Sequence, residues 1–134
     1  MIQANRETGV AAVEMALMLP ILLLLVLGIV DFGLLMYQQQ IVTNASREGA
    51  RQGIVMATPR PTAGDITNVV NSYLTAAGLA PGSGSVTITG AGGAAGTSLS
   101  VSLVYPYQFI VLDKFVPGLP GTHNLNGNST MGLE

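Results

Sequence analysis

The chain has 134 residues and a formal net charge of −2, which leaves room for one long helix and one small domain. Charged residues make up only 9% of it, against about 25% in soluble domains. The chain contains no cysteine, which excludes disulfides and thiolate metal sites, and its acidic balance gives no basic footprint for nucleic acid.

The first predicted element is an apolar helix. Val10 to Val30 supplies 21 residues with one charge, Glu14, near the start of the run. A membrane-spanning helix needs about 20 apolar residues at ~1.5 Å each, so this run predicts a single membrane span. A charge deep in such a helix costs roughly 2.5–3.5 kcal/mol, less near its end, so Glu14 needs a functional explanation. Asp31 follows ~25 Å further along and is expected at the far membrane interface.

The helical pattern continues beyond the apolar run and becomes amphipathic. A helix from Val10 to Ala57 is expected, ended by Pro59 and Pro61. Small side chains at a spacing of four residues allow two backbones to approach closely, and this pattern predicts a helix-packing face. Packing between subunits and packing against the protein's own domain both remain open. The small residues are Ala45, Gly49, Gly53 and Ala57.

A second, shorter helix is predicted after these prolines. Thr62 to Asp65 is typical of a capping box, in which an N-cap side chain and an acidic residue three positions on bond each other's backbone. Apolar residues from Ile66 to Ala77 then recur at helical spacing, and Gly78 ends the pattern.

The rest of the chain predicts a small antiparallel sheet. Residues 85–89 and 98–105 alternate between polar and apolar side chains and are joined by a glycine-rich stretch, which indicates a hairpin. Pro106 is expected to interrupt the second run, and Phe109 to Leu112 is ambiguous between strand and helix. Alternation from Leu125 to Leu133 predicts a third strand. The expected fold class is α+β: a long membrane-spanning helix, then a domain of one amphipathic helix and a short antiparallel sheet.

No constellation of catalytic residues stands out. His123 is the only histidine, so a catalytic triad and a metal site are both unsupported. The glycines between Gly90 and Gly96 lack the lysine and serine or threonine of a phosphate loop. We therefore expect neither enzymatic activity nor a cofactor or metal.

The N-terminal pattern resembles a known signal. A short polar leader ends in Gly9, and Glu14 comes fifth after it inside an apolar helix, as in the class III signal of type IV pilins and pseudopilins. Longer strings narrow the likeness: residues 9–17, 19–20, 28–33 and 45–51, with the ending 128–134 also similar. Together they resemble the TadE-like family, pseudopilins (minor pilins) of tight-adherence (Flp, type IVb) pilus systems.

This resemblance implies a role and three regions. Residues 1–9 are the leader, residues 10–58 the transmembrane and extended helix, and residues 59–134 a small periplasmic or extracellular α+β domain. A prepilin peptidase is expected to cut between Gly9 and Val10, and Glu14 is implied to set registration with another pilin-like subunit. The implied partners are that peptidase, other pilin-like subunits, the inner-membrane assembly machinery and membrane lipid, without nucleic acid. The chain is then expected to take part in filament assembly. Its place within the pilus, at the pilus tip or in an assembly complex stays open.

A second interpretation stays open: a permanently anchored periplasmic binding or adhesion module whose single span is never processed. Orientation is a related question. Positive charges slightly favour a cytoplasmic C-terminal side, because Arg6 stands against Arg47, Arg51 and Arg60. The peptidase signal implies the reverse, a cytoplasmic N-terminus in the bacterial inner membrane with a periplasmic C-terminal domain. We give the signal precedence.

Overall fold

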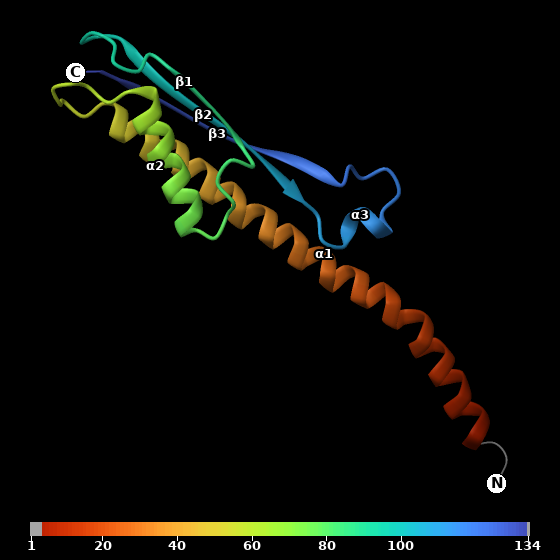
Figure 1. Ribbon diagram of the computed structural model, residues 1–134. Coiled ribbons are helices and arrows are strands. Elements are labelled where there is room, and N and C mark those ends of the chain that lie inside the picture. The colour runs from red at the N-terminus through yellow and green to blue at the C-terminus, as the bar shows by residue number, and fades with distance from the viewer. Residues whose placement is uncertain (1–3, 134) are drawn as a thin grey trace. The chain divides into compact units, whose positions relative to one another are not determined.

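The computed structural model describes residues 4–133, and side chains from residue 9 onward. Its first element is α1 (Ala4–Gly53), a helix of 50 residues that continues through Pro20 (Figure 1). The helix therefore ends four residues before Ala57, earlier than the sequence pattern predicts. Ile54 still donates a backbone hydrogen bond to Ala50, after which the chain leaves helical geometry ahead of Pro59. Two compact units share α1, the division falling between Leu34 and Leu35.

The larger unit comprises residues 35–108 and 122–134. Its second helix, α2 (Ala63–Ala76), begins at the capping box that the sequence predicts. The Thr62 hydroxyl donates to Asp65 Oδ2 at 2.7 Å, and the Thr62 backbone N–H donates to the same oxygen at 2.9 Å. These hydrogen bonds, the hydroxyl first, hold the pKa of Asp65 below its ordinary value.

A three-stranded antiparallel sheet completes this unit, in the order β1-β2-β3. Its strands are β1 (Ser85–Thr89), β2 (Ser98–Gln108) and β3 (Thr122–Gly132). The predicted α+β fold, with an apolar N-terminal helix, a further helix and a short antiparallel sheet, is confirmed. The alternating pattern of β2 corresponds to one buried face, because every second side chain from Leu99 to Tyr107 is buried.

Pro106 does not interrupt β2, contrary to the sequence expectation. The strand runs on to Gln108, and Pro106 lies opposite Asn124 of β3. β1 pairs with β2 only as far as Val104, so beyond that point one side of β2 is an open edge. A proline is tolerated there because its missing N–H removes no ladder bond on an edge.

The core of this unit forms between the sheet, α2 and the second half of α1. One face of α2 is fully buried through Ile66, Val70 and Leu74. The sheet contributes β2 side chains and Leu125 of β3. From α1 come Ile41, Val42, Ala45 and Ala50, all buried. Burying such side chains contributes about 1.5–3 kcal/mol each for the larger ones, which stabilises the unit without disulfides.

The smaller unit joins residues up to Leu34 of α1 with the segment Phe109–Gly121. This segment connects β2 to β3 and contains a single helical turn, α3 (Leu112–Phe115). Of the residues that were ambiguous in the sequence, Phe109 to Val111 form an irregular approach to that turn, and Leu112 begins it.

Candidate functional site

The first part of α1 exposes its apolar side chains on all faces. Leu17 is 68% exposed, Leu22 62% and Ile29 65%. Within the described residues, one helix is long and apolar enough to cross a membrane, and it includes this stretch. The chain therefore fits a single-pass membrane protein, since these side chains need an apolar environment that the protein itself does not provide.

Gly9 and Val10 lie inside α1, so the bond between them has helical backbone geometry. A β-carbon added at Gly9 would meet no atom within 4 Å. Glycine inside a helix costs about 1 kcal/mol relative to alanine, and internal packing does not require it here. Gly33 stands equally free on the same helix, which makes it a matched control for substitutions at Gly9. Residues 1–3 of the expected leader lie outside the described residues.

Glu14 is exposed on α1, one turn beyond Val10. Among the residues whose side chains are described, one ion pair is present, between Arg51 and Glu48 at 3.9 Å, so Glu14 has no cationic partner there. A carboxylate surrounded by exposed leucine, valine and methionine side chains is available to a cation brought by another molecule or by a new chain terminus.

The predicted small-residue face divides at its C-terminal end. Ala45, Gly49 and Gly53 are buried, whereas Ala57 is exposed and lies beyond the helix. A β-carbon added at Gly49 would come 2.6 Å from Val70 Cγ2 of α2, and one added at Gly53 would collide with Leu99 and Ile66. These two glycines therefore pack α1 against the protein's own α2 and sheet.

A third close approach was not anticipated from the sequence. Gly127 of β3 lies against α1, where an added β-carbon would be 2.5 Å from the Val42 carbonyl oxygen. Nearby, the Gln39 amide donates to the Asn126 carbonyl at 2.9 Å. The alternation in β3 predicts that Gly127 faces inward, but only the contact in the structure shows that the α1 backbone lies over it.

Asp31 has a role that sequence reasoning missed. Its side chain is 1% exposed, and its carboxylate accepts hydrogen bonds from three consecutive backbone N–H groups. Ile110 donates to Oδ1 at 3.1 Å, and Val111 and Leu112 donate to Oδ2 at 2.9 and 3.0 Å. The carboxylate thereby satisfies N–H groups at the start of α3, which lacks a side-chain cap of its own. No sequence signal marks this pairing, because the donors are backbone groups about 80 residues away.

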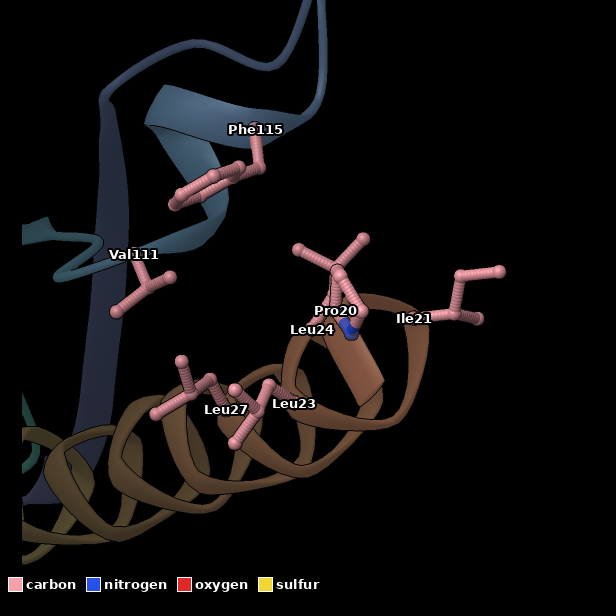
Figure 2. A pocket seen from close by; sticks show the side chains of 7 residues that line it. All are labelled: Pro20, Ile21, Leu23, Leu24, Leu27, Val111 and Phe115. Carbon is pink, nitrogen blue, oxygen red and sulfur yellow. The ribbon is translucent and has the colours of Figure 1, made fainter. Parts of the chain in front are cut away.

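An apolar pocket of about 390 Å³ lies in the smaller unit, between α1 and α3. In Figure 2, Val111 and Phe115 face α1 from one side, and the α1 residues face them from the other. Packing at the level of Gly28 is close, since an added β-carbon there would be 3.4 Å from Leu112 Cδ2. The α1 lining consists of Pro20, Ile21, Leu23, Leu24 and Leu27.

Among the described residues, no group of three or more histidine, aspartate or glutamate side chains is arranged to hold a metal ion. His123 is exposed near the start of β3. The features of the described chain that call for a functional explanation are the apolar part of α1, the carboxylates of Glu14 and Asp31, and the packing of α3.

A comparison with protein families found one match. Residues 9–51, about a third of the chain, match the model of the family described as TadE-like protein. The matched range covers Gly9, Glu14 and Asp31, and two of the four small residues, Ala45 and Gly49. No curated protein and no solved structure matches the chain. The family resemblance identified from the sequence is confirmed.

Proposed function

We propose that this chain, a TadE-like protein over residues 9–51, is a minor pilin or pseudopilin needed to assemble a tight-adherence (Flp) pilus. One observation carries the proposal. The family match coincides with a stretch of helix whose apolar side chains are exposed and whose only charge between Gly9 and Val30 is Glu14. Such a helix suits a subunit that is stored in a membrane and later packs beside other apolar helices.

In this proposal the chain is a substrate of a peptidase and has no catalytic role of its own. A prepilin peptidase removes residues 1–9 by cutting between Gly9 and Val10. Any side chain before the cut would obstruct a peptidase that approaches the backbone closely. The free space around Gly9 supports this interpretation, because the glycine has no packing role within the described chain.

The Val10 amine released by the cut would carry a positive charge one helical turn, ~6 Å, from Glu14 of the same chain. Opposite charges attract strongly in a low-dielectric environment, and either one alone is costly to desolvate. We propose that Glu14 instead reaches the Val10 amine of a neighbouring pilin-like subunit and thereby sets the axial stagger between the two. Pairing with its own amine would only ease burial.

The proposed location is the bacterial inner membrane, with the N-terminus cytoplasmic and the sheet-bearing domain periplasmic. The partners are the peptidase, other pilin-like subunits, the assembly machinery and membrane lipid. An alkaline phosphatase fused after Glu134 should be active in this orientation. An inactive fusion would instead indicate that the C-terminal domain is cytoplasmic.

Glu14 substitutions test the assembly role. Glu14→Ala should still insert and still lose residues 1–9, because neither step needs the carboxylate, but pili should be absent. Glu14→Asp should restore assembly only in part, since its shorter side chain misplaces the carboxylate. Pilus counts by electron microscopy, with crosslinking through a cysteine at Met18 in this otherwise cysteine-free chain, provide the readout.

Glu48→Ala is the matched control. It removes a carboxylate from the same helix, outside the apolar run, and its only described ion pair is a 3.9 Å contact with Arg51. Surface pairs of this kind contribute about 0–1 kcal/mol, so pili should be normal. Normal pili from Glu14→Ala as well would reduce Glu14 to a tolerated polar residue.

A further inference from the structure

The β2–β3 connection, Phe109–Gly121, is unusually long for the two strands that it joins. It has 13 residues, whereas hairpin loops usually have about 2–5. It belongs to the same compact unit as α1 residues up to Leu34, the part of α1 with exposed apolar side chains. The role proposed above uses nothing from this segment.

The segment itself presents large apolar side chains. Ile110 is 57% exposed, Phe115 64% and Val116 38%. Clustered exposed apolar groups of this size are uncommon on water-facing surfaces and indicate contact with a membrane or another protein.

Most backbone N–H groups of the segment already have hydrogen-bond partners within the protein. Pro117 and Pro120 carry no N–H, and seven of the remaining eleven residues donate identified hydrogen bonds. Three of those bonds go to the Asp31 carboxylate. Another runs from Phe109 to the Gly121 carbonyl at 3.3 Å and closes the segment at its base. Unsatisfied backbone groups cost several kcal/mol in hydrocarbon, so non-helical backbone is tolerated there only when such partners exist.

The pocket between α3 and α1 favours a lipid over a soluble ligand. Every side chain that lines it is apolar, whereas sites for soluble ligands place a few polar groups to orient the molecule. Leu24, in its wall, precedes Asp31 by seven residues, or ~10 Å along the helix. With Asp31 at the interface, the pocket opens inside the ~30 Å hydrocarbon layer.

We propose that Phe109–Gly121 inserts into the membrane beside α1 and that a lipid acyl chain occupies the pocket between them. The pocket wall is continuous with the helix surface that faces hydrocarbon, so the same medium covers both. The exposed Lys114 has a long apolar stem, which lets its ammonium group reach lipid phosphates from this depth. The proposal depends on the membrane span and is independent of the pilus role.

Tryptophan fluorescence tests this insertion directly, because the chain contains no tryptophan. The full-length protein carrying Phe115→Trp is reconstituted into phosphatidylethanolamine–phosphatidylglycerol vesicles whose acyl chains are brominated. Leu22→Trp, in the middle of the span, reports full insertion, and Ser83→Trp, in an exposed loop of the larger unit, reports water. Each variant is measured at high lipid dilution so that contacts between protein copies are rare.

Bromine should quench Phe115→Trp nearly as strongly as Leu22→Trp, and aqueous iodide should quench only Ser83→Trp. Quenching of Phe115→Trp by iodide and not by bromine would overturn the proposal, and with Leu22→Trp still quenched by bromine it would leave the span and the proposed function standing. Protection from both quenchers would equally overturn it, because a protein partner would then cover the segment. Failure of bromine to quench Leu22→Trp would reject the span itself.

Discussion

The two parts of α1 on either side of residue 35 differ in sequence and in surroundings, since the first is almost wholly apolar and the second is amphipathic. From Val10 to Val30 the large side chains other than the half-buried Leu24 are exposed, while between Ile41 and Gly53 the inward-facing positions are buried and mostly small. Large side chains on every face suit a fluid medium such as lipid, which adapts to any shape. Small side chains on one face suit a fixed partner, because a glycine lets a neighbouring side chain approach the helix backbone. The size of the side chains along α1 therefore distinguishes the part that is suited to lipid from the part that packs against the protein's own domain.

The substitution expected to change stability most is Gly49→Leu, on the packed part of α1. The added side chain would be forced into Val70, Ile66 and Val101, and overpacking of this kind costs about 3 kcal/mol. The thermal unfolding midpoint of the full chain in detergent, followed by circular dichroism, should fall clearly. Gly33→Leu adds the same side chain to the same helix where the space is free, so its midpoint should not fall below that of wild type. Equal midpoints for the two variants would show that the small-residue face does not hold the domain together.

Asp31→Asn tests the smaller unit. An amide offers one acceptor oxygen in place of two, so at least one N–H group among Ile110, Val111 and Leu112 loses its bond. Hydrogen bonds to charged groups contribute roughly 1.5–3 kcal/mol, so these amides should exchange with solvent about tenfold faster or more. Hydrogen exchange of the full chain in micelles measures this change.

Asp113→Asn is the control for that experiment. It makes the same substitution within α3, at a side chain whose Oδ1 is buried without a hydrogen-bond partner in the described structure. Exchange at Ile110 to Leu112 should not change. Equal exchange in wild type and Asp31→Asn would mean that the carboxylate does not hold the segment.

A smaller effect is expected at the start of α2. Thr62→Ala removes the N-cap oxygen that accepts from the Asp65 N–H at 3.3 Å, and loss of such a cap costs about 1 kcal/mol. The same hydroxyl lowers the pKa of Asp65, so the stability linked to this carboxylate is present above its unfolded pKa, near 3.8. That stability is lost as the pH falls through the lower folded pKa. Denaturant unfolding across the acid range should show a weaker pH dependence in Thr62→Ala, and identical pH profiles would refute the cap's role.

The sequence predicts most of the larger unit, because its signals are local. The capping box at Thr62, the helical spacing from Ile66 and the alternation in β2 each depend on neighbours within a few residues. The small-residue spacing also predicts a packing face, but it does not say which partner lies on it. The structure places Gly49 and Gly53 against α2 and the sheet.

Within the smaller unit the sequence predicts the apolar helix, but not the contact between α1 and Phe109–Gly121, and the reason is physical. Asp31 binds backbone N–H groups, which every residue except proline possesses, so no residue type reveals the pairing. The expectation that Pro106 would interrupt β2 was wrong for a related reason. A proline breaks a strand only where a neighbouring strand needs its N–H, and β1 does not extend as far as Pro106. Both errors concern contacts between distant segments, where residue identity carries little information.

The central claim, that this chain is processed as a pilin, is tested most directly by the mass of the mature protein. Intact mass spectrometry of the chain isolated from membranes of its own host, with Gly9→Val and Gly33→Val in parallel, decides it. If the chain is processed as a pilin, wild type and Gly33→Val should begin at Val10, while Gly9→Val should retain residues 1–9. A wild-type protein that still begins at Met1 would contradict the account and favour a permanently anchored module.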